Sequence, residues 1–244
     1  MPVIAVSNPK GGAGKSTTTL LLATYLAEHG ASVCIVDADP RQPIVHWKGK
    51  KGTKSTVEVI GGVKENTLMD TLDKLNHQFI FIDLEGVGSV LVSRSIALAD
   101  FVIIPMQASP EDVRAAKDAI SAVMDEEKVV RRANPDRHIP FKILLNRTSA
   151  PGAPIPWLQR ELEKEIESNR LPRFRTSLAQ REAFKIMFLV GLTLRELPEY
   201  GIAAGNLEGA CQNVHEVAME LIRYLERKDA PVEDQELAEV QIDG

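Results

Sequence analysis

The residues with the clearest chemical pattern follow a short apolar run at the start of the chain. They read Asn8-Pro9-Lys10-Gly11-Gly12-Ala13-Gly14-Lys15-Ser16-Thr17. The three glycines allow consecutive backbone N–H groups to turn inward around a phosphate, and a helix beginning near Lys15 adds its positive dipole end. In a P-loop, the residue at Lys15 reaches the β- and γ-phosphates and the hydroxyl at Ser16 binds Mg²⁺. The segment therefore predicts a phosphate cradle; a glycine-rich turn that only starts a helix is the alternative.

The segment departs from the ordinary P-loop pattern at its first glycine, where this chain has Pro9. A second lysine, Lys10, stands directly before the glycine pair. The run from Lys10 to Ser16 resembles the deviant Walker A motif of the ParA/MinD family of ATPases. The resemblance implies an ATP-hydrolysing enzyme that forms a face-to-face homodimer on ATP binding. In that dimer Lys10 would cross to the phosphates of the partner's ATP, where an externally supplied cation stabilises transition-state charge.

Aspartates stand at the ends of two predicted strands. Asp37 and Asp39 end the second strand, and Asp83 ends the fourth. Ligands of open α/β sheets bind at the carboxyl ends of the strands, so these carboxylates should emerge beside the cradle. By the family resemblance, Asp39 orients the attacking water, while Asp37 and Asp83 hold Mg²⁺ mostly through its waters, a shell that this ion favours. The alternative for each aspartate is a residue that only caps a turn.

The resemblance continues to about residue 225 and assigns further roles. Asn146 ends a strand where relatives place an asparagine against adenine, and the backbone around Pro172 would wall the base. An asparagine at a strand end is otherwise a common turn residue, so both interpretations stay open. The expected cofactor-binding residues are Lys10, Gly11, Gly12, Ala13, Gly14, Lys15, Ser16, Thr17, Asn146 and Pro172. The expected catalytic residues are Lys10, Lys15 and Asp39, and the expected magnesium ligands are Ser16, Asp37 and Asp83.

One segment departs from the family. After its Walker B aspartate the family has a proline-containing switch II, whereas this chain reads Asp83-Leu84-Glu85-Gly86-Val87-Gly88. Gly86 and Gly88 would still absorb the backbone change that hydrolysis demands. Glu85 either assists catalysis or is simply solvated, and the second interpretation is the plainer one.

Secondary structure elements must position these residues. Strand-like apolar runs alternate with helix-period segments, the pattern of a doubly wound, mostly parallel α/β sheet flanked by helices, as in P-loop NTPases. Strands are predicted at residues 3–7, 33–37, 57–60, 79–83, 101–105 and 141–146, and helices at residues 15–29, 68–75, 93–99, 110–125, 156–169, 178–188 and 209–227. We expect one ATPase domain over residues 1–228. Residues 229–244 hold six acids and no Lys or Arg, which predicts a disordered, solvated tail.

Composition limits the protein class. Hydrophobic residues make up 44% of the chain, yet no apolar run is long enough to cross a bilayer, and the N-terminus lacks the features of a signal peptide. We therefore expect a soluble, cytoplasmic protein with no membrane partner. Cys34 and Cys211 have no spacing typical of a disulfide framework or metal site. Removing the six tail acids from the net charge of −5 leaves +1 for residues 1–228.

Positive charge gathers in residues 170–195, which we call the basic strip. It contains Arg170, Arg173, Arg175, Arg181, Lys185 and Arg195, against Glu182 alone. In a dimer this strip would bind DNA phosphates without sequence preference and with strong salt dependence. A solvated face, or part of the ATP pocket, is the alternative for any single residue. The lysine run Lys48, Lys50, Lys51 and Lys54 is interpreted as an exposed loop with no assigned role.

Three functions remain open. The leading one is a ParA-type, nucleoid-associated ATPase that partitions plasmid or chromosomal DNA. Its ATP-bound dimer would bind non-specific DNA, and a centromere-binding, ParB-type partner would stimulate hydrolysis and release it. The second is a positioning or scaffold ATPase for another cargo, such as a DNA-transfer complex or a protein cluster. The third is a small-molecule ligase or kinase on the same fold, against which Lys10 argues. The acidic tail argues against a MinD-like membrane role.

Overall fold

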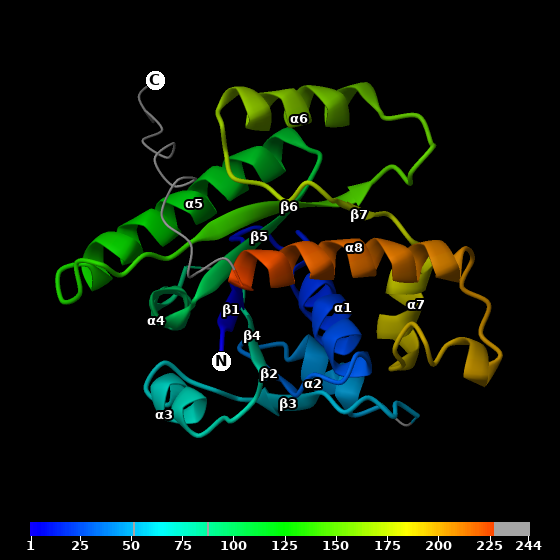
Figure 1. Ribbon diagram of the computed structural model, residues 1–244, viewed down its shortest axis with the longest axis horizontal. Coiled ribbons are helices and arrows are strands. Elements are labelled where there is room, and N and C mark those ends of the chain that lie inside the picture. Colours follow the sequence, from blue (N-terminus) through cyan, green and yellow to red (C-terminus); the bar gives the residue numbers. More distant parts are fainter. Residues whose placement is uncertain (51, 87, 227–244) are drawn as a thin grey trace.

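Seven parallel strands form a single sheet in the order β3-β2-β4-β1-β5-β6-β7 (Figure 1). The computed structural model describes residues 1–226 apart from Lys51 and Val87. The strands are β1 (Val3–Val6), β2 (Val33–Asp37), β3 (Glu58–Gly61), β4 (Phe79–Asp83), β5 (Phe101–Gln107), β6 (Phe141–Thr148) and β7 (Leu178–Ala179). The four residues of β1 and the five of β2 are all buried, as expected for central strands that are covered on both faces.

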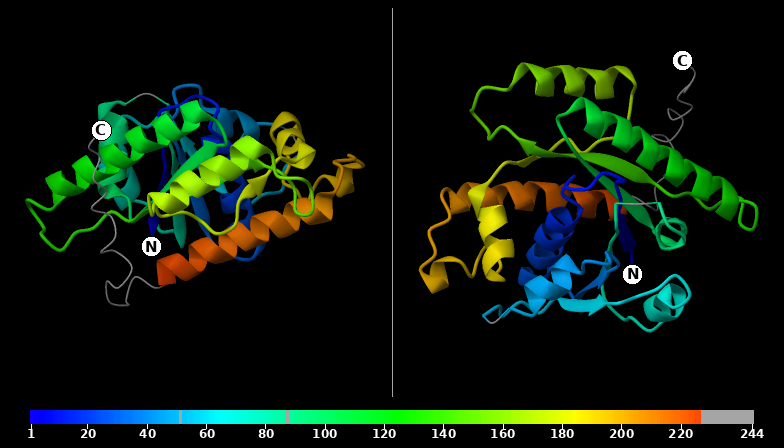
Figure 2. Two further views of the ribbon diagram at one scale, coloured as in Figure 1. Left: turned by 90° about the horizontal axis from the view of Figure 1, so that it is seen from above. Right: turned by 180° about the vertical axis from the view of Figure 1, so that it is seen from behind.

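Helices cover the two faces of the sheet in two layers. They are α1 (Lys15–Glu28), α2 (Pro43–Lys48), α3 (Leu68–Asp73), α4 (Val90–Leu98), α5 (Pro110–Val130), α6 (Trp157–Ser168), α7 (Glu182–Val190) and α8 (Leu207–Glu226), with a 3₁₀ turn at Pro198–Tyr200. One apolar core joins the sheet to α1, α2, α7 and α8. The other joins it to α3, α4, α5 and α6. Figure 2 shows α5 and α6 on one side of the sheet and α8 on the other.

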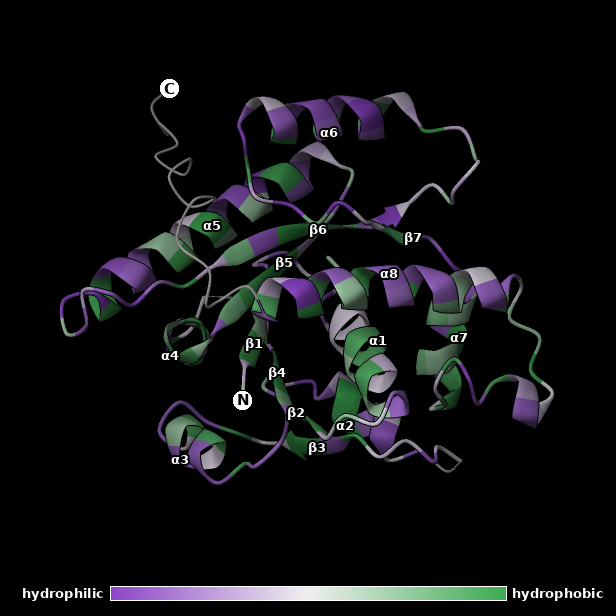
Figure 3. Ribbon diagram, in the orientation of Figure 1, coloured by the Kyte–Doolittle hydropathy of each residue, from purple (hydrophilic) through white to green (hydrophobic). Residues whose placement is uncertain are grey.

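The hydropathy pattern follows this layering. In Figure 3 the central strands are mostly hydrophobic, while α5, α6 and α8 alternate between hydrophilic and hydrophobic residues along their length. Such alternation is expected of helices that bury one face against a sheet and expose the other. No helix within residues 1–226, leaving aside the two undescribed positions, is long and apolar enough to cross a membrane.

The predicted doubly wound parallel fold is confirmed, and the six predicted strands begin within one residue of the observed ones. The predicted helix over residues 178–188 is wrong at its start, because Leu178 and Ala179 form β7 beside β6 and the helix begins at Glu182. Two buried residues are too few to show a strand period in the sequence. The predicted tail at residues 229–244 lies outside the described residues.

Helix α2 was not predicted. It has six residues, which is too short for an apolar helical period to be visible in the sequence. Pro43 occupies its first turn, where the fixed backbone angle of proline suits a helix start. Its free backbone N–H groups are bound by Asp37, a residue of the preceding strand. The interaction that stabilises α2 therefore comes from outside the helix.

Candidate nucleotide-binding site

The loop between β1 and α1 has the backbone geometry of a phosphate cradle. Gly12 and Gly14 have φ angles of 79° and 102°, in the left-handed region that other residues rarely adopt. A side chain on Gly14 would also collide with the carboxamide of Asn146. Helix α1 follows directly, and the carbonyl of Gly14 accepts from Thr18 N at 2.8 Å. The glycines are therefore required by conformation and by close contact.

Two polar side chains hold the cradle in shape. The buried Asn8 donates from Nδ2 to the carbonyl of Pro105 at 2.9 Å and accepts at Oδ1 from Lys10 N at 2.8 Å. Gln107, at the end of β5, donates from Nε2 to the carbonyl of Gly12 at 2.6 Å. Sequence reasoning missed both residues. The available signal was that β5, as a neighbour of β1, must end at the same edge of the sheet.

Lys15 points into the cradle. Its Nζ donates to the carbonyl oxygens of Asn8 at 3.0 Å and Lys10 at 3.3 Å, and the residue is only 7% exposed. Burial lowers the pKa of Lys15, while the nearby carboxylates of Asp83, Asp39 and Glu85 oppose this shift. The ammonium group thus lies among main-chain oxygens at the place where the P-loop pattern puts phosphate oxygens.

Lys10 makes its contacts within its own chain. Its Nζ lies 2.7 Å from Asp112 Oδ2, 3.4 Å from Ser109 Oγ and 3.6 Å from Glu111 Oε2, all at the beginning of α5. The hydrogen bond to Asp112 raises the pKa of Lys10, and the charges of Asp112 and Glu111 add to it. The predicted reach of Lys10 across a dimer stays a prediction. The structure describes the single chain, in which this lysine is held by α5.

Asp37 and Asp83 stand opposite one another on the neighbouring strands β2 and β4. Burial raises the pKa of Asp83 to about 7, and hydrogen bonding from Ser16 works in the opposite direction. Burial also raises the pKa of Asp37, although its Oδ2 accepts from Ile44 N at 2.8 Å and Val45 N at 2.9 Å. Asp37 therefore caps α2 with one oxygen, which is the capping role that the sequence had left open.

The remaining oxygens of these two carboxylates fit a cation. Asp37 Oδ1 and Asp83 Oδ2 are buried, with no hydrogen-bond partner. Unpaired buried carboxylate oxygens are costly, and a hard cation with oxygen ligands would satisfy them. Throughout the described part of the chain, no three His, Cys, Asp or Glu side chains are grouped closely enough to hold a metal by themselves. The donors suit Mg²⁺, which takes few carboxylates and completes its shell with water and phosphate.

Asp39 and the segment after Asp83 line a cavity beside the cradle. The half-buried Asp39 accepts at Oδ1 from Arg41 N at 2.8 Å. The cavity measures about 520 Å³, and Asp37, Asp39 and Glu85 contribute to its walls. A side chain at Gly86 would begin 2.9 Å from the carbonyl oxygen of Pro9 and 3.4 Å from Lys15 Nζ. The segment that replaces the proline-containing switch II therefore lies directly against the P-loop.

Asn146 also reaches the cradle. Its Nδ2 donates to the carbonyl of Ala13 at 3.1 Å and to Thr18 Oγ1 at 3.3 Å, while its buried Oδ1 has no partner. This free acceptor would suit the amino group of an adenine. Next to it, the exposed Arg147 has a φ of 54° and donates from Nη1 to Gln107 Oε1 at 3.3 Å. Sequence reasoning gave Arg147 no role, although its position directly after Asn146 was the signal.

The structure does not bring Pro172 to the cradle. The carbonyl of Pro172 accepts from Ile143 N at 2.9 Å, and Arg173 forms a parallel bridge with the same residue. Ile143 stands three positions before Asn146 on β6, so Pro172 lies about 10 Å back along the strand from Asn146. Its contact with the base stays a prediction.

The residues of the basic strip differ in their surroundings. Arg173 pairs with Glu167 at 2.6 Å, and Arg195 pairs with Glu28 at 3.3 Å. Arg181 emerges after β7, with its Nε buried and without a partner. The other three, Arg170, Arg175 and Lys185, are exposed, and no ion pair is found for them within the described residues. A shared DNA-binding role for the strip stays a prediction.

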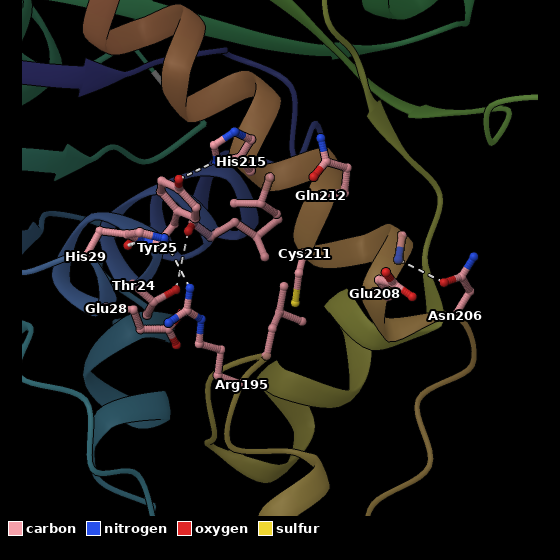
Figure 4. A pocket seen from close by; sticks show the side chains of 14 residues that line it. Thr24, Tyr25, Glu28, His29, Arg195, Asn206, Glu208, Cys211, Gln212 and His215 are labelled. Carbon is pink, nitrogen blue, oxygen red and sulfur yellow. Dashed lines mark hydrogen bonds and ion pairs between the residues drawn. The ribbon is translucent and has the colours of Figure 1, made fainter.

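Arg195 lines a separate pocket of about 560 Å³ between α1 and α8. Figure 4 shows its guanidinium turned toward Glu28 and His29, and its Nη2 lies 3.1 Å from His29 Nε2. On the same wall, Tyr25 Oη and His215 Nδ1 are 2.5 Å apart. The half-buried Cys211 also lines the pocket. Most polar side chains of this pocket therefore form hydrogen bonds or ion pairs with one another.

Three lysines of the run, Lys48, Lys50 and Lys54, have structural contacts that the sequence did not indicate, and Lys51 lies outside the described residues. Lys50 donates from Nζ to the carbonyls of Phe188 and Leu189, which closes the C-terminal end of α7. The buried Trp47 of α2 donates from Nε1 to the carbonyl of Met187 at 3.1 Å. Helix α2, whose first turn donates backbone hydrogen bonds to Asp37 of the candidate site, is therefore attached to α7.

Comparisons with known proteins bear on the family and the fold of the chain. The family model for VirC1 protein matches residues 1–227. A ParA protein of Rhizobium radiobacter is 28% identical over 227 residues, covering 92% of this chain and 98% of the relative. Maintenance of carboxysome distribution protein A of Halothiobacillus neapolitanus is 27% identical over 207 residues, covering 83% of this chain and 91% of the relative. A solved McdA–ATP complex from Cyanothece superposes with a TM-score of 0.71 at 17% identity, covering 91% of this chain and 96% of the solved chain.

Proposed function

The chain belongs to the VirC1 protein family and, with it, to the ParA/MinD family; on this premise we propose that it is an ATP-dependent dimerising ATPase that partitions plasmid or chromosomal DNA. The ATP-bound dimer binds non-specific DNA of the nucleoid. A centromere-binding, ParB-type partner protein stimulates hydrolysis and so releases the dimer. The proposal takes ATP as the substrate and Mg²⁺ as its counter-ion.

One observation carries the proposal. The groups needed for phosphate chemistry meet at one edge of the sheet, and several of their buried oxygen atoms have no hydrogen-bond partner. Lys15 lies in the cradle, and Asp37 Oδ1 and Asp83 Oδ2 are buried beside it without partners. Asn146, which donates to the carbonyl of Ala13 in the loop, offers a free acceptor at its Oδ1. A structural role alone would leave these buried polar atoms unsatisfied at considerable cost, whereas a bound magnesium nucleotide would satisfy all of them.

The chain's own residues have distinct tasks in this reaction. The amides from Gly11 to Ser16 bind the phosphates, and Lys15 balances their charge. Asp39, which lines the cavity next to the cradle, orients the attacking water. When bound, Mg²⁺ supplies neutralisation of charge on the phosphate oxygens. Lys10 of the second copy adds a cation that stabilises charge in the transition state.

Turnover and DNA retention test this proposal together. ATP hydrolysis is measured for the protein alone, with plain DNA, and with a candidate ParB-type partner. DNA retention is measured with and without ATP over a series of salt concentrations, because binding to phosphates weakens steeply with salt. We expect retention to require ATP and stimulation to require the partner. DNA binding that is equal with and without ATP would contradict the proposal.

Positioning of another cargo is the second candidate. It is favoured by the 27% identical relative that is named for carboxysome distribution, and by the internal ion pairs of Arg173 and Arg195, which make a weaker DNA surface. In this case the ATP cycle is the same, but the partner belongs to a protein cluster or a DNA-transfer complex. Imaging the labelled protein after replacement of exposed strip residues separates the two. A partition ATPase loses its nucleoid association, whereas a protein-anchored one keeps its pattern.

A further inference from the structure

Lys10, the residue expected to act on the partner's nucleotide, is bound in its own chain by Asp112. We propose that Asp112 restrains Lys10 in the single chain, so that dimerisation requires the phosphate charge of the partner's nucleotide to draw Lys10 away from Asp112, and the dimer forms only at a higher protein concentration than it would without this restraint. This inference rests on the proposed function, because it concerns the same cross-dimer lysine. Asp112 is a positioning residue here, since it acts through Lys10 and touches no nucleotide itself.

The surroundings of Asp112 show why it holds the lysine firmly. The residue is 1% exposed, and its Oδ2 accepts from both Lys10 Nζ, at 2.7 Å, and the hydroxyl of Ser109. Its Oδ1 is buried with no hydrogen-bond partner. Within the described residues, Lys10 is the one cation recorded in contact with this carboxylate. Removing Lys10 would therefore leave a buried negative charge without a counter-charge, which is strongly unfavourable.

The backbone of Lys10 is held in place, whereas its side chain can change partner. Its backbone N–H is bound by the buried Asn8, which is itself tied to β5. Its side chain is 31% exposed, and no residue besides those at the start of α5 is recorded in contact with its ammonium group within the described chain. Glu111 contributes little, because its side chain is 84% exposed and the pair is separated by 3.6 Å.

The competition between Asp112 and a nucleotide depends on charge. Electrostatic attraction grows with the charge that the ammonium meets, and a triphosphate presents more negative charge than a diphosphate. A triphosphate on a second copy therefore draws Lys10 away from Asp112 more strongly than a diphosphate does. Replacing the carboxylate by a neutral amide removes the competing charge, so Lys10 becomes available to either nucleotide.

The experiment compares wild type with Asp112→Asn. Dimer formation is followed by sedimentation velocity over a range of protein concentrations, with Mg²⁺ and either the slowly hydrolysed analogue AMPPNP or ADP. The variant should reach half-dimerisation with AMPPNP at about one tenth of the wild-type concentration, as for loss of one hydrogen bond to a charged group. With ADP the midpoint should shift by the same factor or less, because a diphosphate attracts Lys10 less strongly than a triphosphate does. The matched control is Glu111→Gln, the exposed neighbour, which should shift the midpoint less than about twofold.

A double variant tests whether the effect passes through Lys10. If Asp112 acts only by restraining this lysine, Lys10→Ala with Asp112→Asn must dimerise as poorly as Lys10→Ala alone. Should Asp112→Asn melt much earlier than wild type, Asp112→Ser replaces it. Serine keeps an acceptor at this position of the first helical turn without a charge, and it must show the same gain.

Each outcome decides between the proposals. If the wild-type chain forms no dimer with AMPPNP, the result contradicts the proposed function itself. A wild-type chain that dimerises with AMPPNP, while Asp112→Asn dimerises no better at an unchanged melting temperature, removes only the restraint by Asp112. Weaker dimerisation of a folded Asp112→Asn would mean that the carboxylate supports the cross-dimer position of Lys10, which also overturns the inference.

Discussion

The nucleotide edge of the sheet and the basic strip differ in how far their polar side chains are paired within the chain. At the nucleotide edge, Asp37, Asp83 and Asn146 each keep a buried oxygen without a partner. In the basic strip, Arg173 and Arg195 are already paired within the chain. A buried group without a hydrogen-bond partner indicates a place for a ligand, whereas a charge that is paired within the chain is less available to one. The first region is thus prepared for a bound group, and the second is prepared only in part.

The contrast also separates two kinds of sequence signal. The cradle is specified by residues that are adjacent in the chain and constrained by backbone geometry, as Gly12 and Gly14 show with their positive φ angles. The basic strip was identified by counting the charged residues of one segment. Such a count does not show which acidic residues of other segments pair with them. Arg195 is paired with Glu28, a residue of the first helix. A motif therefore predicts chemistry better than a local excess of charge does.

The largest expected effect in this comparison comes from Lys15→Ala. The ammonium of Lys15 lies in the cradle, and burial lowers its pKa, so its loss removes a preplaced cation from the phosphate site. We expect ATP turnover to fall about 1,000-fold, as for loss of a group that stabilises transition-state charge, with weaker nucleotide binding as well. Turnover is measured in the presence of DNA and partner protein.

The control for this variant is Lys128→Ala. Lys128 lies near the end of α5 with a 72% exposed side chain and pairs with Asp125. An equal loss of charge there should leave turnover within about twofold of wild type. Full activity in Lys15→Ala would show that the cradle is not the catalytic site.

Asp39→Ala should have the next largest effect and a different signature. Asp39 lines the cavity beside the cradle and lies outside the loop from Gly11 to Ser16 that is expected to bind the phosphates. We expect turnover to fall about 100-fold, as for loss of a residue that orients the attacking nucleophile, while ATP affinity stays near that of wild type. Isothermal titration with AMPPNP measures the affinity, and phosphate release measures turnover. A parallel loss of both quantities would mean that Asp39 binds the nucleotide instead.

The sequence predicted most of the fold, and it located the loop that has the geometry of a phosphate cradle, for one physical reason. Buried parallel strands are continuous apolar runs, and the cradle is a contiguous motif, so both can be recognised locally. The short elements α2 and β7 were missed because each is stabilised by a partner elsewhere: α2 by Asp37, and β7 by β6. The contact between Lys10 and Asp112 was missed in the same way, since it joins residues about a hundred positions apart.

Asp83 provides a smaller, pH-dependent prediction within the nucleotide edge. Burial raises its pKa from 3.8 to about 7, so between these values the folded chain keeps a proton that the unfolded chain has lost. Stability without nucleotide therefore falls as pH rises from about 4 to 7, and the penalty is complete above pH 7. Asp83→Asn should melt several degrees above wild type at pH 8, from a difference of a few kcal/mol, and close to wild type near pH 4.

Magnesium nucleotide should reverse this difference. A cation beside Asp83 favours its charged form, so wild type should gain melting temperature with Mg²⁺ and AMPPNP at pH 8. Asp83→Asn should gain less, because it lacks the free carboxylate oxygen at this position. An asparagine variant that melts below wild type at pH 8 without nucleotide would show that the buried carboxylate is stabilised by a contact other than those described.

The smallest expected effects come from the basic strip, where Lys185→Ala and Arg195→Ala form a matched pair. Lys185 is exposed on α7 with no ion pair found in the described chain, whereas Arg195 is held by Glu28 and His29. If the strip binds DNA, Lys185→Ala should weaken ATP-dependent retention a few-fold and reduce the slope of log affinity against log salt by about 1, because one phosphate contact is lost. Arg195→Ala should leave that slope unchanged. Equal slopes for both variants and wild type would exclude Lys185 from the DNA surface, and a larger change for Arg195→Ala would mean that its ion pair opens when DNA binds.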